Sequence, residues 1–142
     1  MAKVNAIPKG LHSLTAQLNV DGAAEAIELY KRAFGAEELW RIGEPAAVAG
    51  LSVGGAQLFL AQESPPRGTR SPDAAGYTTV RIELFVDDPQ AVQQRAIAAG
   101  ARQGSRIEEH AHALVGGGTM HMLQGGVIDP FGHMWLIGKF LE

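Results

Sequence analysis

The polar side chains best suited to bind a ligand lie in two stretches of alternating sequence. Thr15 and Gln17 belong to the first stretch, and Arg81 and Glu83 stand at the matching positions of the second. Residues two apart on a strand point to the same side of a sheet, so each stretch would present its polar side chains together. Arg81 could bind a carboxylate bidentately or form an ion pair with Glu83. The alternative is that all four are ordinary solvent-facing strand residues.

Three histidines in the second half of the chain could bind a divalent metal. On a strand His110 and His112 would face one side, and His121 follows nine residues after His112. Together with Glu83 they would supply the imidazole and carboxylate donors that such ions take. The competing interpretation is a flexible, solvated loop, because two glutamates precede the pair and the glycine run 116–118 follows it.

Large apolar side chains could complete a pocket. Aromatic and methionine side chains suit the recognition of flat or varied ligands. The candidates are Trp40, Phe59, Phe85, Met120, Met122 and Trp135. Since most residues of these types belong to cores, we expect only two or three of them to contact a ligand. No serine has a nucleophile-elbow context and no glycine run precedes a phosphate-binding helix, so neither triad hydrolysis nor nucleotide binding is indicated.

A repeated module must position these groups. Residues 20–36 (VDGAAEAIELYKRAFGA) return in similar form as residues 86–101 (VDDPQAVQQRAIAAGA). A period this long, present in two copies, predicts a duplicated supersecondary module and not a solenoid. Two such modules packed together would leave a cleft, and we expect the function to lie there.

The first copy has the pattern of a strand, a helix and three further strands. Leu14 to Val20 alternates between apolar and polar residues, as a strand does. Asp21 is expected to cap a helix with one apolar stripe, and Gly35 to end it. Three strands are predicted after it, over 38–42, 47–53 and 56–61, with a two-glycine turn between the last two. Residues 62–78 hold three prolines, two glycines and no hydrophobic period, which predicts a linker.

The second copy begins with a predicted strand over 79–86, whose apolar residues, Val80 among them, would face the helix. Asp88 is expected to cap that helix, with Pro89 at its first position, and Gly100 to close it. Residues 103–124 are less regular and predict a strand, a long mobile loop and a strand. A turn at 129–132 then leads into a final apolar strand, Met134–Phe140.

Composition narrows the class of protein. The 142 residues are 46% hydrophobic and 19% charged, with a net charge of -3, which suits one globular domain and not a disordered chain. No Lys/Arg run exceeds two residues, so neither nucleic acid nor a membrane surface is an expected partner. The chain has no cysteine, no apolar run long enough to span a membrane and no signal-peptide pattern. We therefore expect a cytoplasmic protein.

Two stretches resemble a known family. Residues 19–36 are similar to the first helix of the vicinal oxygen chelate superfamily, and residues 129–135 (DPFGHMW) to the turn before its last strand. The superfamily includes glyoxalase I, bleomycin-resistance proteins and extradiol dioxygenases, and the similarity is greatest to its PhnB-like, glyoxalase/bleomycin-resistance-like branch. The resemblance implies an α+β fold in which two βαβββ modules form curled mixed sheets around a cavity. It divides a single domain, 1–142, into a first module (11–61), a linker (62–78) and a second module (79–142).

The resemblance also implies where a metal would be held. Enzymes of the superfamily bind a divalent metal through four residues, two per module, and the aligned positions here are Thr15, Gly50, Arg81 and Leu136. These residue types do not make a divalent metal site. We therefore expect no cofactor, and the alternative is a displaced divalent metal bound by Glu83 and the histidines.

These observations predict metal-free binding or sequestration of a small organic molecule in the cavity between the modules. The residues expected to contact it are Thr15, Gln17, Trp40, Phe59, Arg81, Glu83, Phe85 and His121. The alternative is a metal-dependent lyase, isomerase or dioxygenase with relocated ligands, so the sequence leaves open whether the protein is an enzyme. Each module would leave a strand edge and its cavity face uncovered, which predicts a homodimer.

Overall fold

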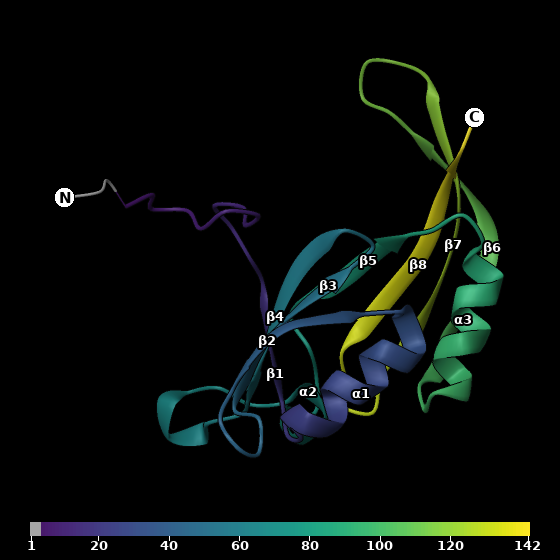
Figure 1. Cartoon of the computed structure of the whole chain (residues 1–142). Helices are drawn as coiled ribbons and strands as arrows, with labels where there is room; N and C mark the ends of the chain where they lie inside the picture. The colour runs from purple at the N-terminus through teal and green to yellow at the C-terminus, as the bar shows by residue number, and fades with distance from the viewer. Residues whose placement is uncertain (1–3) are drawn as a thin grey trace.

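The computed structural model describes residues 4–142 and contains two mixed four-stranded sheets (Figure 1). The first sheet has the strand order β1-β4-β3-β2, with β1 parallel to β4 and the other neighbours antiparallel. One helix, α1, connects β1 to β2. The elements of this module are β1 (Gln17–Val20), α1 (Ala23–Phe34), β2 (Glu37–Ile42), β3 (Val48–Val53) and β4 (Ala56–Gln62).

The second sheet repeats the arrangement with the order β5-β8-β7-β6, which confirms the predicted α+β fold of two βαβββ modules. None of the helices in residues 4–142 is long and apolar enough to cross a membrane. Two short helices, η1 (Pro65–Arg67) and α2 (Pro72–Ala75), lie between the modules. The second module consists of β5 (Arg81–Phe85), α3 (Pro89–Ala98), β6 (Arg102–Ala113), β7 (Thr119–Ile128) and β8 (Met134–Leu141).

The two modules share one hydrophobic core. Alternate residues of the first sheet, such as Leu51 and Leu60, are fully buried together with the apolar stripe of α1. Trp135 of β8 reaches the same core, with its ring centroid 4.2 Å from that of Phe34 and 5.3 Å from that of Tyr30. Burial of these large rings is the main favourable term for the core, and it requires both modules to be in place.

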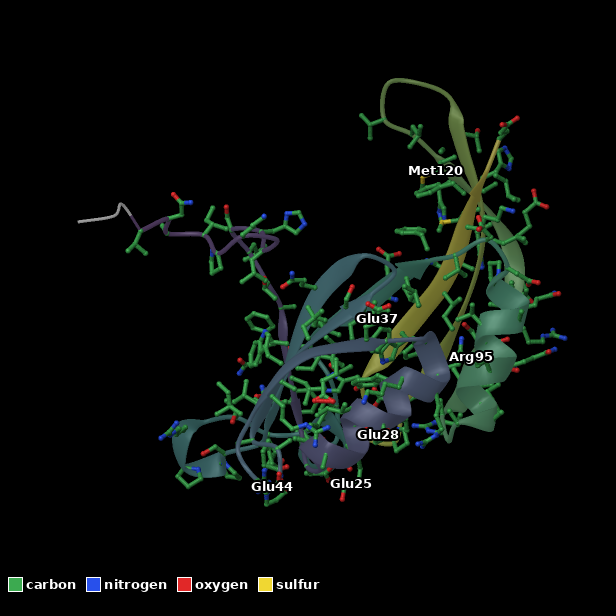
Figure 2. The ribbon with its side chains drawn as sticks, in the orientation of Figure 1. Glu25, Glu28, Glu37, Glu44, Arg95 and Met120 are labelled. Carbon is green, nitrogen blue, oxygen red and sulfur yellow. The ribbon has the colours of Figure 1, made fainter. Side chains whose placement is uncertain are left out.

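A polar contact also joins the helices α1 and α3. Arg95 of α3, labelled in Figure 2, donates from Nε to the carbonyl oxygen of Arg32 at 2.6 Å and from Nη2 to that of Lys31 at 3.3 Å. The last carbonyl groups of a helix have no partner within the helix. The guanidinium therefore caps α1 from the neighbouring module, at the end where a cation also interacts favourably with the helix dipole.

The opposite face of each sheet carries no helix, and we call it the open face. In the first sheet Gln17 and Phe59 lie on it, because they alternate with the buried residues of their strands. In the second sheet Arg81, Glu83 and Phe85 lie on it for the same reason. Within residues 4–142 the sheets are not closed around a common cavity, and the two hollows described below lie against one sheet each.

Several predicted elements are confirmed nearly to the residue. β2, β3 and β4 begin and end within one residue of their expected bounds. Gly35 follows the end of α1 in the left-handed conformation, with φ of 67°. At the start of α3, Oδ1 of Asp88 accepts a hydrogen bond from Ala91 N at 3.1 Å, and Pro89 is the first helical residue. Local sequence signals determine these features, because they involve neighbouring residues only.

The strand that opens each module is shorter than predicted. β1 begins at Gln17 and leaves Leu14 89% exposed, and β5 begins at Arg81 and leaves Val80 60% exposed. The strand pairing accounts for this difference, because β4 pairs with 17–20 and β8 with 81–85. In both segments the alternation of apolar and polar residues begins before the first residue that pairs with a neighbouring strand.

The predicted cap of α1 is wrong. Gly22 occupies the cap position, and no side chain from that position makes a capping hydrogen bond. Oε1 of Gln62 accepts a hydrogen bond from Ala23 N at 3.0 Å instead. Parallel pairing sets Gln62 opposite Val20, so the end of β4 lies beside the first turn of the helix.

The long mobile loop predicted within 103–124 is also wrong, because this segment forms a β-hairpin whose register shifts lie between Gln103 and Glu108. β6 and β7 pair without interruption from Glu108 and Gln124 to Ala113 and Thr119. Leu114 N donates to the carbonyl oxygen of Gly118 at 3.0 Å, which closes the turn. Figure 1 shows the hairpin extending beyond α3. The three glycines all have positive φ, so they serve the reversal of the chain.

Candidate functional site

The open face of the first sheet carries a row of side chains at one level across its four strands. In strand register the row is Gln17, Phe59, Gly50 and Trp40. The indole of Trp40 lies directly over Gly50, where a Cβ would collide with the Nε1 and Cε2 atoms of the ring. Trp40 also meets Phe59 edge to face, with centroids 5.0 Å apart and an interplanar angle of 72°. Gly50 is therefore the residue that lets the indole lie flat on the sheet.

A hollow of about 530 Å³ opens beside this row, and we call it the aromatic hollow. Its walls are the rings of Trp40 and Phe59, Leu39 of β2, and residues 8–11 of the N-terminal segment, including Leu11. Nε2 of Gln57 donates to the carbonyl oxygen of Gly10 at 2.6 Å, which fixes that segment over the sheet. The hollow is mainly apolar, with Lys9 and Gln57 as its polar side chains.

The open face of the second sheet is more polar. Glu83 accepts a hydrogen bond from Nε2 of Gln124 on β7 at 2.9 Å. Phe85 stacks on Phe140, with centroids 5.0 Å apart, and both rings remain about half exposed. Arg81 lies on the same face, two residues before Glu83, but the structure pairs Glu83 with Gln124 and forms no Arg81–Glu83 ion pair among residues 4–142.

The residues predicted to bind a ligand are thus divided among several surfaces. Gln17, Trp40 and Phe59 share the row on the first sheet. Arg81, Glu83 and Phe85 share the open face of the second sheet. The other two predicted residues lie outside both groups. Thr15 precedes β1. His121 lies on the opposite face of β7 from Gln124, and its Nδ1 is 3.7 Å from Oε1 of Glu109.

The described residues do not form the alternative metal site. His110 and His112 do share one face of β6, with ring centroids 6.2 Å apart. His110 Nε2 contacts the carbonyl oxygen of Gln124 at 3.2 Å, and His121 points to the other face of the sheet. Within 4–142 no three His, Asp or Glu side chains are grouped so that they could hold a metal ion.

The positions aligned with the family's metal ligands do not fit a metal either. Gly50 is covered by the indole of Trp40, so a longer side chain there would have to displace the ring. Arg81 brings a positive charge and Leu136 an apolar side chain, and both lie on the open face of the second sheet. A divalent cation needs carboxylate or imidazole donors, which these residues do not supply.

A second hollow, of about 500 Å³, lies at the base of the open face of the second sheet, and we call it the linker hollow. Residues 72–78 form one wall, and the β7–β8 turn forms another. The floor contains Met134, Ile128 and Arg102, which are in register across β8, β7 and β6. The linker is held in place by the carbonyl oxygen of Phe131, which accepts from Ser71 Oγ at 3.0 Å and from Asp73 N at 2.9 Å.

The β7–β8 turn is organised by one buried carboxylate. Oδ2 of Asp129 accepts from the Tyr30 hydroxyl at 2.7 Å and from Trp135 Nε1 at 2.9 Å. Oδ1 accepts from the backbone N–H groups of Phe131 and His133 at 2.9 and 3.0 Å. Burial beside this carboxylate raises the pKa of the Tyr30 phenol well above its usual value of 10.0. Four donors satisfy Asp129, so it serves the fold and is not free to bind a ligand.

The sequence interpretation missed several residues of these hollows. Leu39, Gln57 and the segment 8–11 were not expected at a site, and neither was Arg102. A glycine on a central strand, as Gly50 is, indicates close approach of another group and was the available signal for the covering ring. The position of the N-terminal segment depends on a hydrogen bond between residues 47 apart, which no local pattern reveals.

Comparisons with known proteins agree with this architecture. Residues 10–137 match the model of the Glyoxalase/Bleomycin resistance protein/Dioxygenase superfamily. An uncharacterized protein of Mycobacterium bovis is 37% identical over 133 residues, which cover 89% of this chain and 82% of the relative. An uncharacterized protein of Mycobacterium tuberculosis has the same identity, over 74% of its length.

Solved structures with this fold span bacteria and plants. A gene product of Arabidopsis thaliana has a TM-score of 0.70 at 22% identity, covering 91% of this chain and 99% of that one. TioX from Micromonospora sp. ML1 has a TM-score of 0.67 at 25% identity, covering 92% and 100%. A bleomycin-binding protein complexed with bleomycin has a TM-score of 0.55 at 21% identity, covering 90% and 98%. The chain therefore belongs to the Glyoxalase/Bleomycin resistance protein/Dioxygenase superfamily.

Proposed function

We propose that this protein binds a small organic molecule in the aromatic hollow, that no metal ion takes part, and that it acts by binding and not by catalysis. The observation that carries the proposal is the indole of Trp40 lying over Gly50, beside a hollow of about 530 Å³. In the enzymes that the chain resembles, the position of Gly50 would hold an acidic metal ligand. Here the same place on the sheet offers an aromatic surface.

The chemistry of the hollow supports a flat, mainly apolar ligand. Ligand pockets of this size are usually lined by apolar and aromatic side chains, with a few polar groups that fix orientation. Trp40 and Phe59 supply the rings, and Lys9 and Gln57 supply the polar groups. A protein of the same fold has been solved with bleomycin bound, which supports small-molecule binding as a use of this architecture.

Tryptophan fluorescence tests the proposal directly, because the chain contains two tryptophans and Trp135 is 1% exposed. We would titrate bleomycin and a panel of planar aromatic compounds into the wild type, Trp40→Phe and Trp135→Phe. A ligand of the aromatic hollow should quench the wild type and Trp135→Phe saturably, and should leave Trp40→Phe unquenched. Binding that is detected by calorimetry but quenches none of the three proteins would place the ligand elsewhere and contradict the proposal.

Elemental analysis tests the absence of a metal. Protein purified without a metal-affinity tag and dialysed should contain well under one equivalent of zinc, nickel, manganese or iron. One equivalent that survives dialysis would overturn the metal-free proposal. Glu83, His110 and His112 would then be the first residues to substitute, since they share the open face of the second sheet.

We also propose that the protein is a homodimer and that a second copy covers the part of the open face of the second sheet around Phe85 and Phe140. The stacked rings of Phe85 and Phe140 are about half exposed on this face, and exposed apolar surface of this kind is typical of an interface. In such a dimer Arg81 and Glu83 would border the contact. Light scattering should give twice the 15.0 kDa mass of one chain. The monomer mass at micromolar concentration would contradict the proposal.

The cytoplasm remains the location that we propose, with no nucleic acid as a partner. A chain without cysteine is compatible with a reducing compartment. A net charge of -3 gives no attraction to phosphate backbones. Fractionation of cells with an antibody to the protein would test the location.

A further inference from the structure

We infer that the linker hollow is a second binding site, which takes a small organic anion and holds its charged end on Arg102. This site is separate from the aromatic hollow. The two share no lining residue, and they lie against different sheets. The inference therefore does not depend on the function proposed above.

The hollow is built by parts of the chain that are fixed in place. Its floor is a row of residues in register across three strands of the second sheet, with Arg102 on β6, Ile128 on β7 and Met134 on β8. The wall above the floor is the linker, which the carbonyl oxygen of Phe131 holds through Ser71 and Asp73. The hollow of about 500 Å³ is thus already formed without a ligand.

Charge decides what this hollow can bind. Asp129 and Asp73 both line it. The carboxylate of Asp129 accepts four hydrogen bonds and is therefore not available to a ligand. Asp73 belongs to the linker wall, whereas Arg102 belongs to the floor. The guanidinium of Arg102 has no ion pair or side-chain hydrogen bond to any residue of 4–142. It is the positively charged side chain of the lining, and its fork of donors suits a carboxylate.

The rest of the lining indicates an organic anion more than an inorganic one. Met134, Ile128 and Pro72 present apolar atoms to the hollow, and the ring of Tyr77 is 71% exposed at its rim. An aromatic or aliphatic body could cover this surface while its carboxylate reaches Arg102. Burial of that body would add a hydrophobic contribution that phosphate or sulfate cannot provide.

Nuclear magnetic resonance with benzoate as the probe tests the inference. Benzoate should shift the amide signals of Gly76, Gly100 and Gly132, which line the hollow, and leave the indole N–H signal of Trp40 unchanged. Benzamide and benzamidine, which have the same ring but are neutral and cationic, should bind at least about tenfold more weakly. A failed search for ligands of the aromatic hollow would leave this result unaffected, so the two proposals can fail separately.

Substitution then tests the role of the guanidinium. Arg102→Gln should weaken benzoate binding at least about tenfold, since it removes the charge at an exposed position where folding should be preserved. Arg106→Gln is the matched control on the same strand, because the Arg106 side chain is 80% exposed and its Nη2 lies 3.6 Å from Glu108 Oε1. Equal binding by wild type and Arg102→Gln would overturn the inference. So would equal affinity for benzoate and benzamide, or shifts confined to residues of the first sheet.

Discussion

The turn between the third and fourth strands has opposite roles in the two modules. In the first module Gly54 and Gly55 join β3 to β4, with φ of 57° and 81°, and both are exposed. In the second module residues 129–132 join β7 to β8, and Asp129 there is 3% exposed. The first turn reverses the chain, and within residues 4–142 its glycines make no hydrogen bond to the second module. The second turn holds distant parts of the molecule together.

The second turn contacts three other regions. Through Asp129 it accepts a hydrogen bond from Tyr30 of α1, and the carbonyl oxygen of Phe131 holds the linker. Nε2 of His133, just after the turn, contacts the carbonyl oxygen of Asn19 in β1 at 2.8 Å. The duplicated modules share their strand order, but the second turn also makes hydrogen bonds to the other module.

The helices show the same asymmetry. α1 buries six residues, all of them apolar or aromatic, whereas α3 buries three, and one of these is Gln93. Nε2 of Gln93 donates to the carbonyl oxygens of Ser105 and Gly126 at 2.8 and 3.1 Å. The first module therefore supplies more of the buried apolar residues of the shared core, and α3 is tied to its own sheet by a polar side chain.

The largest effect should come from removing the carboxylate of the second turn. Asp129→Ala should lower the free energy of unfolding by about 3–5 kcal/mol, because it leaves the buried donors of Tyr30 and Trp135 unpaired at about 1–3 kcal/mol each. Urea unfolding followed by circular dichroism would measure the loss.

The first turn supplies the matched control for that variant. Gly54→Asn should change stability by less than about 0.5 kcal/mol, since an Asn-Gly pair suits a two-residue hairpin turn. Comparable losses in the two variants would show that both turns carry similar weight, and the contrast between the modules would have to be abandoned.

A methyl group added to a glycine should destabilise the second turn more than the first. Gly132 has φ of 88°, and a Cβ there would lie 2.5 Å from Asp73 N and 2.9 Å from the carbonyl carbon of Pro72. Gly132→Ala should therefore cost about 2–4 kcal/mol, from backbone strain together with displacement of the linker. Gly55 has φ of 81° and nothing within 4 Å of its Cβ position, so Gly55→Ala should cost only about 1–2 kcal/mol.

Thermal unfolding of the two glycine variants would check this difference. Proteolysis adds a second readout, because only Gly132→Ala should expose the linker to cleavage near residues 72–78. Equal losses of stability without new cleavage would mean that the linker can move away at little cost, and that the second turn does not fix it.

The hydrogen bond from Tyr30 to Asp129 should affect how the stability of the protein depends on pH in the alkaline range. Tyr30→Phe removes a hydrogen bond to a carboxylate and should cost about 1.5–3 kcal/mol at neutral pH. The pKa of Tyr30 is raised by burial in the folded protein, so above its usual value of 10.0 the unfolded chain releases this proton while the folded protein retains it. The folded state then binds more protons than the unfolded state, and stability falls as the pH rises.

The difference in stability between wild type and Tyr30→Phe should therefore narrow above pH 10 by up to about 1.4 kcal/mol per pH unit. Urea unfolding at a series of pH values from 8 to 11 would measure it. A constant difference across this range would show that Tyr30 ionises as easily in the folded protein as in the unfolded chain, and that its hydroxyl is not buried against Asp129.

Much of the fold could be predicted because it depends on local signals. Alternation identified β2, β3 and β4, and turn and cap residues such as Gly35 and Asp88 fixed helix ends. The repeat and the DPFG turn then indicated the family. For the candidate site, the sequence identified Trp40 and Phe59 as pocket residues, and the structure places them together.

The rest could not be predicted because it depends on contacts between distant residues. The aromatic hollow needs the N-terminal segment, held by Gln57, and the linker hollow needs the contact of residues 71–73 with Phe131. The cap of α1 is a further case, because Gln62 is 39 residues from Ala23 and Asp21 stands at the position that a local pattern favours. A side chain that caps a helix from another strand cannot be recognised in the sequence of that helix.

The smallest expected effects come from removing the two kinds of helix cap. Asp88→Ala and Gln62→Ala should each lower the free energy of unfolding by about 1 kcal/mol, since each leaves an N–H at a helix start without its acceptor. The two variants should affect different parts of the chain, because Asp88 caps its own helix whereas Gln62 also ends the pairing of β4 with β1. Hydrogen exchange should show faster exchange only near Ala91 in Asp88→Ala, but at both Ala23 and the end of β1 in Gln62→Ala. Asp88→Asn, which keeps an acceptor, should exchange like the wild type. Faster exchange confined to α1 in Gln62→Ala would show that the remote cap acts as locally as the ordinary one.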